Sequence, residues 1–585
     1  MSSILDVDTL LAVDVGSVNT RACLFDVVDG RYRLVSTTRV HSTAQAPILD
    51  VSEGVHRALF RLQTITGRRL LDEAESLIMP VTQDGAGVDA FVATSSAGPS
   101  VKTVVVGLMP GVSLESVRKL AASSYLEVVD ELGLVDHRGD AEKIDVIVKA
   151  RPDLLLIAGG TDGGARASVL QMIETLGLAA GLLPDGRMPR VIFAGNRHLA
   201  ASVVEQFGDG APIALAPNIR PGLEEEDLAA ARGRLAEIVS EVKSSSISGF
   251  DELKLWSGGN LMLTADAFGR VIRFLSEVYD PDKGALGMDI GASQTTVAAG
   301  FGGDLRLAVH TDLGLGASLP GLLKYCPMEK IMRWLPISLR ETEVRDYIHN
   351  KALHPGTVPI EKDELFIEYA LARQVMRTAL FRARAGWPAG KDARRTCLMP
   401  PLVAMVISGG TLARSPKPGL AALAVLDALQ PVGVTSLLLD GHCILPALGA
   451  AAGPMPMVTV QALESGALMS LGTVVVPVGK GRSGRPAVHV MLERENGEVI
   501  QGEVKPGQLA TIPLSQGEQG RLTIRPERGF DVGFGGRGRA GRVSVVGGAV
   551  GIIVDARGRP VPEVRDPGRQ RDLNQKWLWD IDATE

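Results

Sequence analysis

The sequence has few cysteines and few aromatic residues. The four cysteines among its 585 residues, Cys23, Cys326, Cys397 and Cys443, are widely scattered and lack the spacing of a metal-ligand set. We therefore expect a reducing compartment and no framework of disulfides. Aromatic side chains make up only 4% of the chain, whereas hydrophobic residues make up 45% and glycine occurs 67 times. This composition favours α/β layers of small aliphatic side chains over an aromatic-rich β protein.

A strong net charge and a long apolar segment are also missing. The formal net charge is −6, which provides no general attraction to nucleic acid or to an anionic membrane. Apolar runs such as VSVVGGAVGIIV (543–554) are too short and too rich in glycine to cross a bilayer. The first ten residues lack the basic region and apolar stretch of a secretory signal. We therefore expect a cytoplasmic protein with no nucleic-acid or membrane partner.

Two segments far apart in the chain repeat the same pattern. Residues 10–30 (LLAVDVGSVNTRACLFDVVDG) and 286–303 (LGMDIGASQTTVAAGFGG) each contain an apolar run with an aspartate near its end. A glycine, small polar residues, a second apolar run and a turn signal follow. A single copy would fit an ordinary β-hairpin with a polar bend. Two copies roughly 275 residues apart arise by chance far less often, so they indicate an internal duplication.

The residue types in both segments suit phosphate. Glycine lets the backbone approach a ligand closely, and small hydroxyl or amide side chains can donate hydrogen bonds to phosphate oxygens. An aspartate at the end of a buried strand is costly unless something satisfies it, and a hydrated Mg²⁺ ion would do so. We therefore predict two phosphate-binding hairpins, with Asp14 and Asp289 holding the metal. Their candidate residues are Asp14, Gly16, Ser17, Asn19, Thr20, Asp289, Gly291, Ser293 and Thr295.

A third segment follows the hairpins in the chain. LVAMVISGGTLAR (402–414) is an apolar run that ends in Ser408, Gly409 and Gly410 before a helical pattern. Such a junction lets a flat base or a ribose lie against bare backbone. After it, LLLDGHCILPALGAAAG (437–453) is rich in small residues that would permit close helix packing between two lobes.

Two other glycine-rich segments have two interpretations each. HTDLGLGAS could bring Gly314 and Gly316 near the phosphates at a helix start, and its Asp312 could be a ligand or only a helix cap. AGGTDGGARA (158–167) could cradle a phosphate or a cofactor tail, or it could be a tight turn in which Asp162 caps the next helix.

The ordered set of two hairpins, a glycine junction and a closing helix resembles the actin/Hsp70/sugar-kinase superfamily. This resemblance implies an α/β fold with a two-lobed, actin-like ATPase core, that is, a duplicated RNase H-like unit. It also implies that ATP or ADP binds with Mg²⁺ between the lobes.

More of the chain resembles the glutamate mutase L family. The similarity runs from about residue 8 to about residue 455 and includes FVATSSAGPSVKTVVVGLMPGVSLESVRKLA, DLLLIAGGTDGGARASVLQMIETL, RVIFAGN and MDIGASQTTV. Proteins of this family accompany cobalamin-dependent carbon-skeleton mutases. The resemblance therefore implies an ATP-handling accessory protein, similar to the reactivating chaperones of cobalamin enzymes. Its expected partner is a cobalamin-dependent mutase or a relative.

The sequence departs from the family pattern at four places. It has SSAGPS (95–100) where the family has SSAAGG, and Ala165 where an asparagine follows TDGG. It has ISGGT in place of a GTGG-like adenosine turn, and Arg21 where a lysine follows the first hairpin threonine. These changes leave the nucleotide fold intact, and they leave ATP hydrolysis and the choice of partner open.

The remaining patterns divide the chain into five parts. Short apolar runs alternate with helical patterns after residue 100, which is typical of βαβ units with a parallel, Rossmann-like sheet. After residue 458 the chain has short strand patterns and many turns, typical of a β-rich domain. The predicted parts are 8–100 (first lobe), 101–245 (α/β insert), 246–285 (connecting helical segment of the first lobe), 286–458 (second lobe) and 459–585 (β-rich domain with a terminal helix).

Three functions are compatible with these residues. The preferred one is an ATP-binding, slowly hydrolysing switch or chaperone-like accessory protein. The alternatives are a non-catalytic nucleotide-binding scaffold and, less favoured, a small-molecule kinase, for which no candidate catalytic acid is found. No residue that would align the attacking water is identifiable, and the oligomeric state is not predicted. GFGGRGRAGR (533–542) fits a glycine-rich loop better than an RNA-binding segment.

Overall fold

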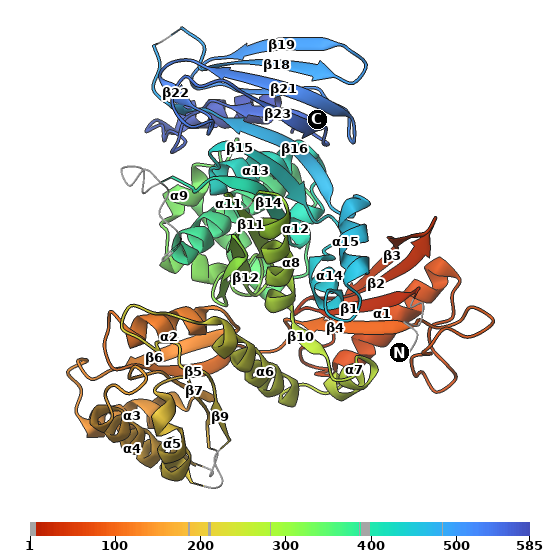
Figure 1. The fold of residues 1–585 in the computed structure, drawn as a ribbon. Coiled ribbons are helices and arrows are strands. Elements are labelled where there is room, and N and C mark those ends of the chain that lie inside the picture. Colours follow the sequence, from red (N-terminus) through yellow and green to blue (C-terminus); the bar gives the residue numbers. More distant parts are fainter. Residues whose placement is uncertain are drawn as a thin grey trace.

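The computed structural model contains two lobes, an insert and a β-rich C-terminal part (Figure 1). Among the residues that it describes, no helix is both long and apolar enough to cross a membrane. Cys397 lies outside these residues. The described residues are 8–184, 188–208, 212–280, 282–384, 387, 398–482 and 484–584.

The first lobe is built on a five-stranded mixed sheet. Its strands lie in the order β10 (Leu261–Leu263), β4 (Ala90–Ser95), β1 (Leu10–Val15), β2 (Asn19–Val28) and β3 (Arg31–His41). β1 is buried along its whole length, pairs antiparallel with β2 and pairs parallel with β4. The first predicted hairpin therefore forms the middle of the sheet, with α1 (Val51–Thr66) packed on it. β10 was not expected, because residues 246–285 were predicted to be helical.

A second sheet repeats this arrangement. It begins with β13 (Asp304–His310), β12 (Thr295–Phe301), β11 (Gly284–Ile290), β14 (Leu402–Ser408) and β15 (Gly433–Leu439). When the five strands of each set are numbered as they occur in the chain, their order across the sheet is 3-2-1-4-5 in both lobes. In both, the first strand lies in the centre and pairs in parallel with the fourth. Asp14 pairs with Thr94 in the first sheet, and Asp289 pairs with Ser408 at the same place in the second. The duplication is confirmed, and the fold is the predicted two-lobed, actin-like α/β fold.

The turns after the two central strands are also alike. The amide of Gly16 donates to the carbonyl of Asn19, and the amide of Gly291 donates to the carbonyl of Gln294, each at 2.9 Å. A Cβ on either glycine would lie 3.0 Å from that carbonyl oxygen. Glycine therefore keeps both turns tight enough to leave their backbone open to the space between the lobes.

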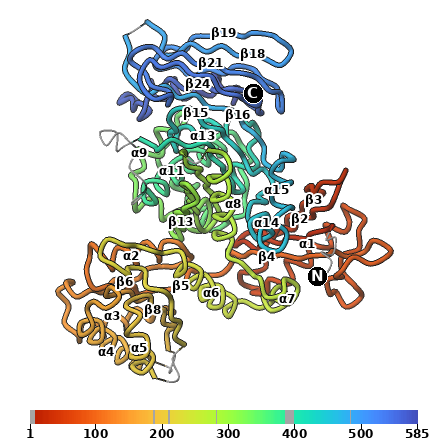
Figure 2. Tube along the Cα trace, in the orientation of Figure 1, coloured from red at the N-terminus to blue at the C-terminus, as the bar shows by residue number. Residues whose placement is uncertain are grey.

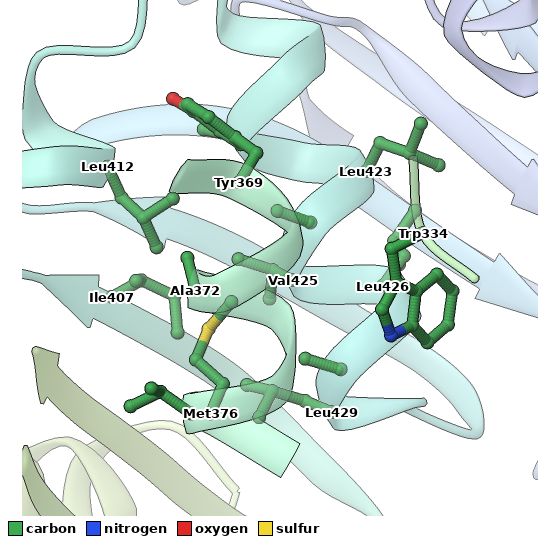
Figure 3. Close-up of a cluster of buried hydrophobic side chains, with 14 of the residues drawn as sticks. Trp334, Tyr369, Ala372, Met376, Ile407, Leu412, Leu423, Val425, Leu426 and Leu429 are labelled. Atoms are coloured by element: carbon green, nitrogen blue, oxygen red, sulfur yellow. The ribbon is translucent and has the colours of Figure 1, made fainter. Parts of the chain in front are cut away.

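The second lobe has the larger apolar core, centred on α11 (Lys362–Ala383) and α13 (Pro418–Leu429). Figure 3 shows side chains of these two helices packed with Ile407 of β14 and with Trp334, which precedes α11 in the chain. Most are fully buried, so they are the main apolar stabilisation of this lobe. Around this core lie η3 (Leu319–Lys324), α9 (Met328–Met332), α10 (Glu341–Leu353) and α12 (Gly410–Ala413).

We expect His310, at the end of β13, to make the stability of the second lobe sensitive to acid. Its Nε2 lies 3.0 Å from the carbonyl oxygen of Ala379, and burial, helped by Arg382, lowers the pKa of His310 to about 4. A histidine in an unfolded chain titrates near pH 6.5, so only the unfolded state takes up this proton as the pH falls from about 6.5 to about 4. We expect this proton to lower the free energy of unfolding by about 2 kcal/mol between pH 7 and pH 5.

Urea unfolding at several pH values tests this expectation. His310→Gln can keep a hydrogen bond to Ala379 but cannot be protonated, so its unfolding free energy should fall less steeply in acid than that of the wild type. Equal slopes for the two proteins would show that His310 does not cause the acid sensitivity.

The insert is a separate parallel α/β layer. Its sheet has the order β6 (Leu126–Leu132), β5 (Val101–Val106), β7 (Leu154–Ile157), β8 (Arg190–Phe193) and β9 (Ile213–Leu215), and all its neighbours pair in parallel. Figure 2 shows it at the end of the molecule opposite the C-terminal strands. Its helices are α2 (Ser113–Ala122), α3 (Asp140–Ala150), α4 (Ala167–Gly181), α5 (Ala200–Phe207) and α6 (Ala229–Ser245), and η2 (Arg197–Leu199) precedes α5.

The C-terminal part shares a sheet with the second lobe. β16 (Met469–Val476), β24 (Ile552–Asp555) and β20 (Leu509–Ile512) extend the second sheet to eight strands. The predicted boundary near residue 458 therefore does not divide the sheets, because β16 pairs with β15. A further antiparallel sheet has the order β19 (Val499–Val504), β18 (Val488–Arg494), β21 (Gln519–Pro526) and β23 (Gly541–Val546). A separate pair of short strands, β17 (Val478–Gly479) and β22 (Phe530–Asp531), and the final helix α16 (Pro567–Asp580) complete this part.

Two helices connect the lobes. α8 (Thr264–Val278) follows β10 of the first lobe and packs on β11, β12 and β13 of the second, with α7 (Phe250–Trp256) before it. α14 (Leu445–Ala451) follows the second lobe and contacts β1 and β4 of the first, and α15 (Pro456–Glu464) contacts β3. α8 and α14 meet where Arg270 Nη1 donates to the carbonyl of Gly449 at 3.1 Å.

Gly449 is the tightest point of this helix pair. A Cβ there would lie 1.9 Å from the carbonyl oxygen of Ala267. We expect Gly449→Ala to separate α8 from α14 and to lower the free energy of unfolding by roughly 2–3 kcal/mol, as overpacking of a close contact does. Urea unfolding would measure the loss. Gly453→Ala is the matched control, because its Cβ would have only the Arg270 guanidinium within reach, at 3.6 Å; an equal loss in both variants would contradict the prediction.

Candidate functional site

A cleft of about 570 Å³ lies between the two lobes. This volume is typical of small-molecule and cofactor sites. Both predicted hairpins line it, together with the glycine junction after β14. The predicted residues on its walls are Asp14, Gly16, Ser17, Asn19, Asp289, Gly291, Ser293, Gly409 and Gly410.

The two hairpin turns meet across the cleft. The Ser293 hydroxyl donates to the Ser17 hydroxyl at 2.9 Å, although these residues are far apart in the sequence. Gln294 Nε2 donates to the carbonyl of Ser96 at 3.1 Å, which is a second bond between the lobes. The duplicated turns therefore face one another and could hold one chain of phosphates between them.

Asp14 is the acidic residue that the first hairpin contributes to the cleft. Its Oδ1 accepts hydrogen bonds from the hydroxyls of Thr94 and Thr264, at 2.7 and 2.8 Å. Its Oδ2 lies 3.5 Å from Arg21 Nη1. Strand β4 and the start of α8 thus fix the carboxylate from two sides, so that it keeps one orientation in the cleft.

Asp289 is the corresponding acid of the second hairpin, and it is less well satisfied. Burial raises the pKa of Asp289 to about 7; Arg21 opposes this rise, while Asp14 and Asp440 add to it. Burial also raises the pKa of Asp440, although the amides of Leu445 and Ile444 and the Ser408 hydroxyl bind its carboxylate. Asp14, Asp289 and Asp440 therefore all interact electrostatically with the Arg21 guanidinium, and a further cation would favour the ionised forms of these carboxyl groups.

These residues fit a hydrated Mg²⁺ ion better than a directly ligated metal. Among the described residues, no group of three or more His, Cys, Asp or Glu side chains could hold a metal ion. Mg²⁺ usually keeps several of its waters and binds through one or two carboxylates together with substrate phosphates. Asp14 and Asp289 have this character, since each contributes one carboxylate to the cleft from its own lobe.

The glycine junction after β14 brings bare backbone to the cleft. Gly409 has a φ of +113°, and a Cβ there would lie 2.3 Å from the carbonyl oxygen of Ile290. Only glycine therefore fits between the two central strands of the second lobe. Gly410 follows on the cleft wall, and the next hydroxyl, that of Thr411, donates to Glu368 at 2.7 Å.

Five predicted site residues are not on the cleft wall. Thr20 and Thr295 point to the face of each sheet that lies away from the cleft, because side chains alternate along a strand. Both side chains are fully buried there, and neither hydroxyl has a hydrogen-bond partner among the described residues. Gly314 and Gly316 pack behind the second turn, where a Cβ on either would clash with Ala292. Ser408 is buried and binds Asp440, so it supports the site from behind.

The glycine loop in AGGTDGGARA is not among the residues that line this cleft. It follows β7 in the insert, where Asp162 accepts a hydrogen bond from Asn218 Nδ2 at 2.9 Å and pairs with Arg197 at 3.4 Å. Arg166 is the residue before α4, so Asp162 does not cap that helix. Asp312 pairs with Arg382 at 2.9 Å and does not line the cleft.

Several residues of the cleft carried no recognisable signal in the sequence. Tyr125 comes from the insert; its hydroxyl accepts a hydrogen bond from the amide of Ala265 at 2.9 Å. No motif surrounds it, and only the tertiary structure brings it beside Asp14 and Thr264. The same is true of the basic groups on the wall, which are Arg39, His41, Arg61, Lys351 and Arg414.

Comparisons with known proteins agree with the sequence motifs. Residues 10–466 match the model of a family described as MutL protein. Protein MutL of Clostridium tetanomorphum is 22% identical over 394 residues, which are 64% of this chain and 78% of that protein.

Among solved structures, nucleotide-free acetone carboxylase has a TM-score of 0.35 at 11% identity, covering 85% of this chain and 81% of that chain. The nucleotide-free diol dehydratase-reactivating factor has a TM-score of 0.29 at 11% identity, covering 78% of this chain and 99% of that chain. Such low scores carry no conclusion about function, whereas the family match spans most of the chain. The chain belongs to the MutL family, that is, the glutamate mutase L family to which its motifs pointed.

Proposed function

We propose that this protein binds ATP or ADP with Mg²⁺ between its lobes and acts as a switch on a protein partner. One observation carries the proposal: the duplicated hairpin turns face each other, with Ser17 and Ser293 in hydrogen-bond contact at 2.9 Å. A phosphate chain between the turns would touch both lobes at once, so that its loss or cleavage would change how the lobes are held together.

Each wall of the cleft has a role in this proposal. The glycine turns, with Ser17, Asn19 and Ser293, would donate to phosphate oxygens, while Asp14 and Asp289 would hold the waters of Mg²⁺. The ion would neutralise charge on the phosphates. Gly409 and Gly410 would lie against the base or the ribose. Arg39, Arg61 and Arg414 would add positive charge at the wall of the cleft.

The cleft favours slow hydrolysis over rapid catalysis. Asp14 and Asp289 are its only lining carboxylates among the described residues, and both are assigned to the metal. Gln294 could reach a water, but its Nε2 is already bonded to the carbonyl of Ser96. With no free base, turnover on the order of 10⁻³ s⁻¹ is expected, as in switch proteins that lack a completed catalytic site.

A non-catalytic scaffold is the second candidate function. Arg21 favours it, because its guanidinium is 3.5 Å from Asp14 and already supplies a positive charge at the place where the metal is expected. A kinase has less support, since no additional described carboxylate in the cleft could accept a proton from an acceptor hydroxyl.

The proposed partner is a cobalamin-dependent mutase or a relative, and membership of the MutL family supports this choice. The insert could transmit the state of the cleft to it. Tyr125 of the insert lines the cleft, and Thr311 of the second lobe donates to the carbonyl of Leu126 in the insert at 3.2 Å. A movement of the second lobe would therefore shift the insert through this hydrogen bond.

Phosphate release, measured with and without an inactivated cobalamin-dependent mutase, tests this function. We expect slow release with Mg²⁺·ATP, faster release with the mutase present, and recovery of mutase activity that needs ATP. Nucleotide binding without phosphate release would instead support the scaffold. Transfer of the phosphate to an added alcohol would support the kinase.

A further inference from the structure

Three loops of the C-terminal part come together at one end of its sheet. The short pair of β17 and β22 joins them: Val478 pairs with Asp531 and Gly479 with Phe530. The amide of Gly538 donates to the carbonyl of Phe530 at 2.8 Å, which brings in the third loop. Figure 1 shows β22 at the far side of the molecule from the insert.

Glycine makes this gathering possible. A Cβ on Gly529 would lie 2.1 Å from the carbonyl oxygen of Lys480, and a Cβ on Gly538 would lie 3.2 Å from the Cα of Arg528. The three backbones are thus in direct contact, and the buried ring of Phe530 lies beneath them. The basic side chains that they carry are therefore close together, although they come from distant parts of the sequence.

Six exposed cations lie on these loops, and we call them the basic loop cluster. None of them forms an ion pair with another residue in the described ranges. Two acids lie on the same loops and have other contacts: Glu527 lies 3.5 Å from His489, and Asp531 accepts a hydrogen bond from the amide of Gly533. The members are Lys480, Arg482, Arg485, Arg528, Arg537 and Arg539.

A protein of net charge −6 gains no folding stability from six unpaired positive charges in one place, because like charges repel each other. We infer that the basic loop cluster is a docking surface for an acidic face of a protein partner. Charge complementarity of this kind raises the association rate and fixes orientation. The inference concerns a surface apart from the nucleotide cleft and stands without it.

The surroundings favour an acidic protein over a nucleic acid. Proteins that bind single strands stack bases on exposed aromatic rings. Here Phe530 is only 4% exposed, and Phe534 packs so closely on the backbone that a Cβ on Gly541 would lie 2.4 Å from its ring. The cations also lie on short glycine-rich loops. A protein usually enters the major groove of duplex DNA with a helix or a two-stranded ribbon.

Fluorescence anisotropy with a labelled peptide of about ten glutamates tests this inference, and a labelled DNA duplex of about 20 base pairs is the second probe. At low salt we expect the peptide to bind, and to weaken at least tenfold when NaCl is raised from about 50 to about 300 mM. The triple variant Arg528→Glu, Arg537→Glu, Arg539→Glu should bind the peptide at least tenfold more weakly than the wild type. The corresponding triple glutamine variant should lie between the two.

A matched triple variant controls for total charge. Arg31→Glu, Lys102→Glu and Arg151→Glu change the net charge by the same amount at exposed positions on other parts of the chain, and should bind the peptide within twofold of the wild type. Thermal unfolding of all variants would verify that they fold. The inference is overturned if the wild type does not bind the peptide, if both glutamate triples lose binding equally, or if DNA binds more tightly than the peptide at equal salt.

Discussion

Replacing Asp427 with alanine is expected to lower the free energy of unfolding by about 3–5 kcal/mol, the usual cost of removing one partner from a buried ion pair. Asp427 lies on α13, 3% exposed at its side chain, between two arginines. Arg373 Nε donates to one carboxylate oxygen and Arg557 Nη1 to the other, each at 2.7 Å. Without Asp427, Arg373 would be left buried without an acid.

The same network attaches the C-terminal part to the second lobe. Arg557 also binds Asp555 at the end of β24, with Nε 2.9 Å from Oδ1. Burial raises the pKa of Asp555, but Arg557 and Arg559 lower it by more, so the carboxyl stays ionised. Asp427 therefore holds together a helix of the core and a strand contributed by the last part of the chain.

Urea unfolding of Asp427→Ala and Asp427→Asn would measure this contribution. Asparagine keeps one acceptor oxygen, so its loss should be smaller than that of alanine. Asp84→Ala is the control, because Asp84 pairs with Arg69 at the surface, where water and salt screen the two charges and the pair contributes little to stability. Similar losses at Asp427 and Asp84 would show that the buried network contributes little.

Replacement of Asp14 or Asp289 with alanine is expected to weaken binding of Mg²⁺·ATP at least about a hundredfold, which corresponds to about 2.7 kcal/mol. Each variant removes one of the two carboxylates that face the cleft. In either variant Arg21 would interact with one acid fewer, so ATP without Mg²⁺ should lose less affinity than Mg²⁺·ATP. This difference separates loss of metal binding from general damage to the cleft.

Calorimetric titration with and without Mg²⁺ would measure both affinities. Asp304→Ala is the matched control, an exposed aspartate on β13 that does not line the cleft, and it should bind like the wild type. Unchanged affinity in Asp14→Ala and Asp289→Ala would mean that the metal, if bound, lies elsewhere.

The sequence was sufficient to predict the duplicated hairpins and their central acids. This succeeded because a strand, a tight turn and a second strand are neighbours in sequence, so that Asp14, Gly16 and Ser17 keep their relation in any fold containing the hairpin. The glycine junction at Gly409 was identifiable for the same reason. Local patterns predict local geometry, and the repeat then showed that two copies should be placed together.

The parts that sequence could not provide depend on contacts between distant segments. Thr20 and Thr295 follow the pattern of phosphate ligands, yet the alternation of the strands buries them on the opposite face. Tyr125 reaches the cleft only because the insert folds back beside α8. The pairing of β16 with β15 could not be foreseen either, because a strand pattern does not state which sheet it will join.

The most direct test of the central claim is a calorimetric titration of the wild-type protein with ATP in the presence of Mg²⁺, repeated with ADP as a competitor. We predict one binding site per chain with a Kd on the order of 10 μM, displacement by ADP, and a clear loss of affinity when Mg²⁺ is chelated. No detectable binding of either nucleotide would contradict this account. The two facing hairpins would then be inherited architecture, and the protein would act as a scaffold.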